Sequence, residues 1–398
     1  MTTGQDERAL RPHTQEDYFP SFDWLRAACA CAVMFYHGHV FSWNQSGNFA
    51  VQIFFALSGW LIGGILLKSQ PASLPRFFFN RAVRIWVPYY VAAALLLTLS
   101  ALREPITPKW VEIVTYKMTF VYNLFGVPQL ALFHDAMPQK GTLSHFWSVN
   151  VEEQFYLVAP LFLVILAKHL GRSPWLWALL AVIGSRYGLG SIMLGVLAAT
   201  VVHRYGPIHR RVLVRIAMAI ALLASLVALK LDVDYAHVAP VSGLLIVLLL
   251  AVPGRRTAWG TVAGGMSYPL YLNHWIGIYV ANFVLAHVHA GAAGWALNIV
   301  LQAAVDIPIA IALYWFIDRK LLAHRSGWYT PRRGTAVTFT AYAIIAVGLA
   351  YGFFMAPRYA QARQNAGMRA SDSTTNPTPD PLFPARTPSG LPGTASEH

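Results

Sequence analysis

The stretch FPSFDWLRAACACAVMFYHGHVF, residues 19–41, decides the fold, because it is an apolar segment that carries ionisable side chains. Such groups are costly inside a bilayer unless they face protein or water. Arg26 and His37 are eleven residues apart, so a helix turns by about 1100° between them and both project from one face. At a rise of about 1.5 Å per residue, they lie about 16 Å apart along the helix. We therefore predict a membrane helix whose polar face meets neighbouring helices.

Two simpler explanations of this pattern stay open from the sequence. An arginine close to the membrane surface can extend its guanidinium to the interface, and a buried histidine can form a hydrogen bond with a facing helix. Asp23, three residues before Arg26, is placed to pair with it on the same helix.

Composition favours an all-α, polytopic transmembrane bundle. Of the 398 residues, 56% are hydrophobic and only 12% are charged, whereas soluble domains carry roughly 25% charged residues. The net charge of +13 could suggest a nucleic-acid partner. However, the basic residues fall in short clusters between apolar segments, which is the pattern that fixes membrane orientation, so no nucleic-acid partner is expected. We find no cluster with metal-ligand spacing and predict no metal.

The apolar segments predict eleven membrane spans. The expected spans are residues 21–41, 51–67, 76–102, 147–169, 174–186, 188–203, 213–230, 238–253, 266–286, 295–317 and 336–355. This gives a cytoplasmic polar arm (1–20), a transmembrane domain (21–330), an additional transmembrane helix (336–355) and a disordered tail (358–398). The long connection 103–146 is expected outside.

The second span and the connection after it carry two further candidate features. Ser58 and Gly59 are small, so they allow close helix packing or leave room for a ligand. Arg76, Arg81 and Arg84 can bind phosphate groups through their guanidinium forks, or can simply set orientation. Arg84 is the better candidate, because an apolar span follows it at once.

The fourth span opens with Glu152 and Glu153. Glu152 is explained either by the helix dipole or by a role in the bundle, and Glu153, three residues before Tyr156, can form a pair with it that faces the bundle. A carboxylate at this depth can hold a histidine tautomer or orient an acceptor hydroxyl.

The ninth span places Ser267, Tyr271 and His274 on one face over two turns. A nucleophilic serine is disfavoured, because Ser267 lacks a strand-turn-helix elbow. We expect His274 to line the same cavity as His37. A packing hydrogen bond between helices remains the alternative.

Five stretches together resemble the membrane-bound acyltransferase family 3. They are FDWLRA with an Arg-x10-His spacing to His37, VQIFFALSGWLIGGIL, RFFFNRAVRIWVPYY, FWSVNVEEQFYLVAPL and MSYPLYLNHW. They occur in the family's order over residues 20–320. One departure is that Asp318-Arg319-Lys320 stands where family members often have Glu-x-Pro, so no role is given to Asp318.

The resemblance implies a bacterial inner-membrane O-acyltransferase with a cytoplasmic N-terminus. It would move an acetyl or other short acyl group from acyl-CoA, its co-substrate, to a hydroxyl of an extracytoplasmic or lipid-linked glycan. The resemblance also implies a ten-helix transmembrane core, to which the eleventh span would be an addition. The family's essential arginine and histidine correspond to Arg26 and His37, and the resemblance supports a catalytic role for Glu153 and binding roles for Arg84, Tyr271 and His274. We expect the small residues Ser58 and Gly59 to line the passage of the donor thioester. His37 would be a general base or an acyl carrier.

Two other functions fit the same residues. One is a transporter or acyl exporter with the same intramembrane histidine and arginine, although no inverted repeat of broken spans is evident. The other is an acyltransferase that acts on a small molecule such as a macrolide.

Overall fold

The computed structural model describes residues 18–166, 168–288 and 291–372, and every regular element in these ranges is a helix. Six of these helices are long and apolar enough to cross a membrane, and three shorter apolar helices accompany them. The chain is therefore an all-α, multi-pass membrane protein, as its composition predicts.

The chain divides into two compact units. The first unit contains residues 1–94 and 152–341, and the second contains residues 95–151 and 342–398. The predicted domain 21–330 is thus divided between them. Three helices run from one unit into the other: α3 (Leu74–Arg103), α7 (Trp147–Pro160) and α17 (Pro331–Asp372).

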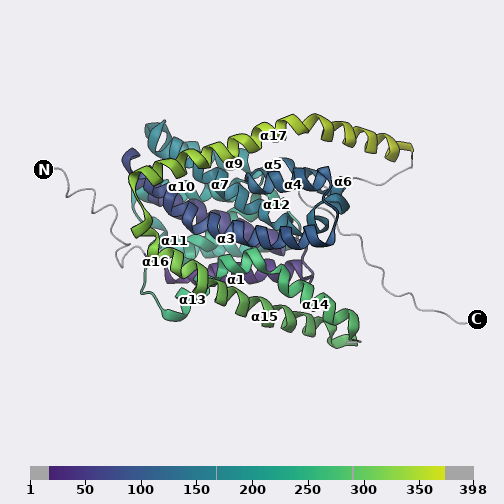
Figure 1. Ribbon diagram of the computed structural model, residues 1–398. Coiled ribbons are helices and arrows are strands. Elements are labelled where there is room, and N and C mark those ends of the chain that lie inside the picture. The colour runs from purple at the N-terminus through teal and green to yellow at the C-terminus, as the bar shows by residue number, and fades with distance from the viewer. Residues whose placement is uncertain (1–17, 167, 289–290, 373–398) are drawn as a thin grey trace, which may run out of the picture. The chain divides into compact units, whose positions relative to one another are not determined.

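The remaining helices of the first unit lie before α3 and after α7 in the chain (Figure 1). They are α1 (Pro20–His37), α2 (Ser46–Lys68), α8 (Lys168–Gly171), α9 (Pro174–Ser185), α10 (Gly190–Tyr205), α11 (Val212–Lys230), α12 (Tyr235–Leu250), α13 (Ala258–Asn273), α14 (Trp275–His287), α15 (Gly294–Leu313) and α16 (Arg319–Trp328). Two π-helical turns, η6 (Leu161–Ile165) and η9 (Tyr314–Asp318), interrupt the ends of α7 and α15.

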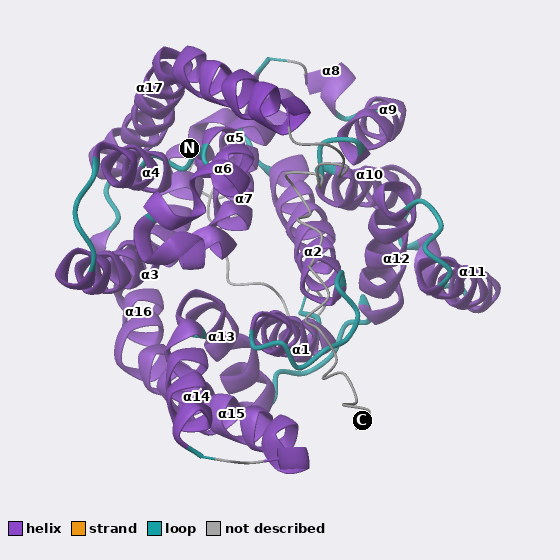
Figure 2. Cartoon of the chain, turned by 90° about the vertical axis from the view of Figure 1, so that its right-hand side faces the viewer, coloured by secondary structure: helices purple, strands orange, loops and turns teal. Residues whose placement is uncertain are grey.

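Helix α2 lies at the centre of one group of helices and packs against α1, α10 and α12, while α11 packs outside α12 (Figure 2). The contact with α10 depends on glycine. A Cβ on Gly59 would lie 2.1 Å from the carbonyl oxygen of Ile192, and one on Gly195 would lie 2.3 Å from that of Ala56. Small residues at both positions therefore let the two backbones meet.

A second group contains α13, α14 and α15, with α15 in contact with both of the others (Figure 2). The predicted ninth span, 266–286, is broken here. Helix α13 starts at Ala258 and ends at Asn273, and α14 starts at Trp275, with His274 between them. Helix α13 also packs against α1, which brings this break towards the first span.

The second unit is more ordered than the predicted loop 103–146. It contains α4 (Pro108–Met118), α5 (Tyr122–Phe125), α6 (Leu130–Phe133) and several 3-10 turns. A buried network holds it together, since Glu112 accepts hydrogen bonds from Lys109, Tyr116 and Gln129 at 2.6, 3.0 and 3.0 Å. The loop thus supplies its own core and polar contacts.

The C-terminal part differs from the expected tail. Helix α17 continues through Asp372, so residues 358–372, which were expected to be disordered, are helical. Most of the predicted N-terminal arm and residues 373–398 lie outside the described residues.

Candidate active site

Helix α1 places Arg26 and His37 as the sequence predicts, on one uninterrupted helix. Pro20 suits the first helical turn, where its missing N–H costs no hydrogen bond, and Asp23 also lies in that turn. The helix ends at His37 rather than at residue 41. Gly38 caps it, and His39 has a φ of 58°, which cannot continue a right-handed helix.

The structure brings His37 and His274 together. Their imidazole rings are stacked, with centroids 5.2 Å apart and planes 23° apart. Trp275 covers both rings, at 5.0 Å from His37 and 5.5 Å from His274. His274 is completely buried. The two imidazoles are therefore neighbours, while the predictions that they line one cavity and take part in the chemistry stay predictions.

The break between α13 and α14 fixes one tautomer of His274. Its Nδ1 lies 2.8 Å from the carbonyl oxygen of Tyr271. Because a carbonyl can only accept, Nδ1 carries the proton and Nε2 keeps its lone pair. An imidazole held in this way can accept a proton at Nε2.

Tyr271 and Ser267, which the sequence places on the same helix face as His274, have different surroundings. The buried Tyr271 ring packs edge-on against Phe54, with centroids 6.2 Å apart, and lies 6.3 Å from His274. Ser267 donates to the carbonyl of Gly264 at 2.7 Å. That bond occupies the Ser267 proton within its own helix, so the structure gives no support to a nucleophilic serine.

Ser58 belongs to a polar cluster between α2 and α7. It donates to Glu152 Oε1 at 2.7 Å, and Tyr156 donates to Glu152 Oε2 at 2.9 Å. The guanidinium of Arg81 lies over the Tyr156 ring, 5.6 Å from its centroid. Ser58 thus faces a carboxylate, whereas its neighbour Gly59 faces α10 and is explained by helix packing rather than by room for a donor.

Of the two explanations left open for Glu152, the structure excludes the helix dipole, and the predicted pair between Glu153 and Tyr156 is not formed. Helix α7 begins at Trp147, so Glu152 is beyond the first turn and is not explained by the helix dipole. The carboxylate that binds Tyr156 is Glu152, four residues before it, rather than Glu153, three residues before it. Residues four apart lie closer to the same face of an α-helix than residues three apart. Glu153 is rotated away from Tyr156, towards α3.

Glu153 nevertheless lies in a distinctive position. Its Oε2 accepts a hydrogen bond from Trp86 Nε1 at 2.7 Å. Its other oxygen, Oε1, is buried and has no hydrogen-bond partner among the described residues. The predicted role of Glu153 in orienting a histidine or an acceptor stays a prediction.

The opposite end of α1 is rich in arginine. Arg26 pairs with Asp23 at 3.3 Å, and Asp23 also accepts from the Tyr18 hydroxyl. Arg84 and Arg81 lie close enough to Arg26 to repel it electrostatically. Arg84 also repels Arg325 on α16. Four arginines from α1, α3 and α16, namely Arg26, Arg81, Arg84 and Arg325, therefore gather in one region, which we call the arginine cluster.

The sequence left the role of Glu152 open and gave none to Arg325 or Asp318. Glu152 could have been found from its four-residue spacing to Tyr156. Arg325 lies far along the chain among other basic residues, so nothing local distinguishes it. Asp318 is buried in the η9 turn and attracts Arg84, although its departure from the family pattern left it without a role.

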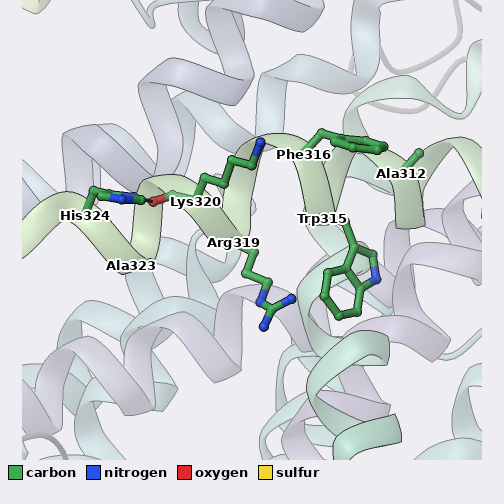
Figure 3. A pocket seen from close by; sticks show the side chains of 7 residues that line it. All are labelled: Ala312, Trp315, Phe316, Arg319, Lys320, Ala323 and His324. Atoms are coloured by element: carbon green, nitrogen blue, oxygen red, sulfur yellow. Dashed lines mark hydrogen bonds between the residues drawn. The ribbon is translucent and has the colours of Figure 1, made fainter.

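An open groove of about 580 Å³ lies elsewhere, along α15, η9 and α16, and none of the candidate site residues lines it (Figure 3). Trp315 and Arg319 extend from the same side of the helix, with the guanidinium 4.2 Å from the ring centroid. Phe316 is 71% exposed. Exposed aromatic and basic side chains on an apolar helix are typical of a membrane interface, so we do not assign the groove to the active site.

Comparison with known proteins identifies the domain. A family model described as an acyltransferase domain matches residues 19–355. Among curated proteins, the peptidoglycan O-acetyltransferase OatA of Listeria monocytogenes is 35% identical over 156 residues, 38% of this chain and 25% of that protein. The putative peptidoglycan O-acetyltransferase YrhL of Bacillus subtilis is 32% identical over 165 residues, 37% of this chain and 24% of that protein.

A third relative is the O-acetyltransferase OatA of Staphylococcus aureus. It is 26% identical over 167 residues, 41% of this chain and 27% of that protein. The matched segments thus span about a quarter of these relatives, as their coverage of 25%, 24% and 27% shows. No solved structure gives a significant match.

Proposed function

Because the chain belongs to the membrane-bound acyltransferase family 3, whose domain covers residues 19–355, we propose that it is an inner-membrane O-acetyltransferase. The donor is a cytoplasmic acyl-CoA, with acetyl-CoA the first choice. The acceptor is a hydroxyl of an extracytoplasmic or lipid-linked glycan.

The single observation that carries this proposal is the organisation of α1. An arginine lies near one end of the helix within a cluster of arginines, and a histidine lies at the other end against a second histidine. One end has the chemistry to bind phosphates and the other has the chemistry to move a proton. An extended pantetheine arm would connect the two.

The arginine cluster supports a polyphosphate donor. Guanidinium groups bind phosphate oxygens through two parallel hydrogen bonds. Among the described residues, Asp23 forms an ion pair with Arg26, whereas Glu152, Glu153 and Asp318 attract arginines of the cluster only over a longer distance. In this proposal, Arg84 and Arg26 bind the phosphates, and Arg81 and Arg325 add positive charge around them.

In the proposed reaction, His37 acts as general base. An imidazole nitrogen takes the proton of the acceptor hydroxyl while the hydroxyl oxygen attacks the thioester carbonyl. The carbon–sulfur bond then breaks, the CoA sulfur leaves, and the proton held by the imidazole can pass to it, so the products are an O-acyl ester and CoA–SH. His274 and Trp275 hold the His37 ring in place by stacking.

The proposed acceptor is inferred from the relatives of this chain. Two of the relatives are named peptidoglycan O-acetyltransferases, which favours a cell-wall sugar hydroxyl. The orientation that suits this acceptor has the N-terminus and the basic clusters in the cytoplasm, and the 103–146 connection outside.

Purified protein in lipid nanodiscs tests the proposal directly. It should release CoA from acetyl-CoA when soluble peptidoglycan fragments are added, and the fragments should gain one acetyl ester per CoA released, with no ion gradient present. A transporter would form no ester under these conditions. Acetyl transfer to no glycan fragment, in a preparation that binds acetyl-CoA, would reject the glycan acceptor.

A further inference from the structure

Three polar side chains on α15 lie next to the two helix ends that carry the histidines. Asn298, Gln302 and Asp306 are spaced by four residues, so they form one stripe along the helix, about 12 Å long. Gln302 and Asp306 are 1% and 2% exposed. Polar side chains buried in a membrane protein are costly unless they bind a partner.

The N-terminal part of the stripe binds the end of α1. Asn298 Nδ2 donates to the carbonyl oxygen of Gly38 at 2.8 Å, and Gln302 Nε2 approaches the same oxygen at 3.4 Å. Gln302 Nε2 also donates to Asn298 Oδ1 at 2.7 Å, which orients the Asn298 amide. Gly38 directly follows His37, and its carbonyl is one of those that a helix end leaves without an internal partner.

The C-terminal part of the stripe binds the start of α14. Asp306 Oδ1 accepts from the backbone N–H of Gly277 at 2.7 Å. In an uninterrupted helix that N–H would bond to the carbonyl of Asn273. Because the chain breaks at His274, the group needs another acceptor, and Asp306 supplies it from a different helix.

Both contacts are made at a glycine, where an added Cβ would overlap the side chain from α15 unless that side chain moved. A Cβ on Gly38 would lie 2.0 Å from Gln302 Oε1, and a Cβ on Gly277 would lie 2.4 Å from Asp306 Oδ2. The φ of Gly38 is −78°, which any residue adopts, so close approach rather than backbone conformation explains the glycine. The two ends are therefore packed directly onto α15.

We propose that the stripe Asn298–Gln302–Asp306 is a positioning device that holds the stacked His37–His274 pair in register by binding the C-terminal end of α1 and the N-terminal start of α14. The inference rests on the proposed function, because it treats the histidine pair as the reacting site. The three residues act through the helix ends and touch no substrate.

Two isosteric substitutions with opposite expected results test the proposal. Asn298→Asp keeps the shape but replaces the donor with an acceptor that faces a carbonyl, so kcat should fall at least tenfold with the KM for acetyl-CoA within twofold. Asp306→Ala should lower kcat by a similar factor, because the backbone N–H of Gly277 loses its acceptor. Asp306→Asn keeps an acceptor oxygen for that N–H and should restore at least half of the wild-type kcat.

The readouts separate positioning from general damage. A structural defect would lower the amount of inserted protein or its acetyl-CoA binding, whereas loss of register lowers turnover of protein that still binds the donor. If Asn298→Asp fails to insert, Asn298→Ala removes the donor without adding charge and should give the same split between kcat and KM.

Wild-type kcat in Asn298→Asp or Asn298→Ala would overturn the α1 part of the proposal. If Asp306→Asn and Asp306→Ala lowered kcat equally, the α14 part of the proposal would be overturned. The activity would then depend on the charge of Asp306 rather than on its hydrogen bond to the start of α14. Failure of the proposed function is distinct, since it would leave wild-type protein without any transfer from acetyl-CoA.

Discussion

At the scale of single residues, the two ends of α1 have separable chemistry. His37 lies beside a second imidazole, whereas Arg26 lies among arginines. Substitutions at one end should therefore change turnover, and substitutions at the other should change donor saturation.

His37→Gln should lower kcat by about 100-fold or more, with acetyl-CoA binding largely kept, because an amide cannot accept a proton near neutral pH. Steady-state acetyl transfer by protein in nanodiscs measures this. A structural histidine would behave differently, since glutamine could replace its hydrogen bond. Substantial turnover by a well-inserted His37→Gln protein would reject the catalytic assignment.

Arg84→Ala should raise the KM for acetyl-CoA by roughly tenfold, because it removes a charged hydrogen-bond donor to phosphate. Arg332→Ala is the matched control, since Arg332 is an exposed cation outside the arginine cluster. Donor titrations of both variants give the comparison. An unchanged KM in Arg84→Ala would leave Arg84 as an orientation signal only.

His209 should make the fold sensitive to acid. It lies in the η7 turn (Ile208–Arg210), buried against Trp60 and the carbonyl of Ala251. Burial lowers its pKa below the usual 6.5, although the hydrogen bond to Ala251 opposes this. As the pH falls below about 6.5, the unfolded chain binds a proton that the folded chain excludes, so the folded state loses stability.

The difference in melting temperature between about pH 7.5 and about pH 5.5 measures this effect. It should be larger for wild-type protein than for His209→Gln, which has no group to titrate. Equal differences for the two proteins would show that His209 is not responsible.

At the scale of elements, glycine determines which helices can pack against each other. Gly59 meets the backbone of α10, whereas a Cβ added to Gly64 on the same helix would touch nothing within 4 Å. The same substitution of glycine by alanine should therefore have different effects on the two faces of α2.

The π-helical turn η9 buries Asp318 near Arg84.

Gly59→Ala should destabilise the protein by about 1–3 kcal/mol, because its Cβ would overlap the carbonyl oxygen of Ile192 and force α2 and α10 apart. Gly64→Ala is the matched control and should be neutral or slightly stabilising, since alanine is the better helix former. Thermal unfolding of both variants in detergent gives the answer. A Gly59→Ala protein as stable as Gly64→Ala would contradict the packing explanation.

At the scale of the whole molecule, the orientation in the membrane decides which end of α1 meets the donor. The basic clusters predict that the connection 103–146 lies outside and that the connection before α13 lies in the cytoplasm. Lys140 and Arg255 are exposed residues of these two connections.

In a variant without Cys29 and Cys31, a cysteine at Lys140→Cys should react with an impermeant thiol reagent in intact cells. A cysteine at Arg255→Cys should react only after permeabilisation. The reverse pattern would overturn the topology, and with it the proposed cytoplasmic side of the donor.

The sequence by itself determined the membrane class, most helix ranges and the shared face of Arg26 and His37. These features depend on local periodicity and hydrophobicity, which act over one helix. The five stretches also carried the family resemblance. By contrast, the sequence placed the end of α1 four residues too late and missed the break at His274.

Only the tertiary structure decided which side chains meet. In the folded chain, Glu152 rather than Glu153 binds Ser58 and Tyr156, and Gly59 packs against the backbone of α10. It also joined Gly277 to Asp306, which is 29 residues away. The reason is physical: the faces of a helix are fixed by its own period, but the partner of each face depends on helices distant in the chain.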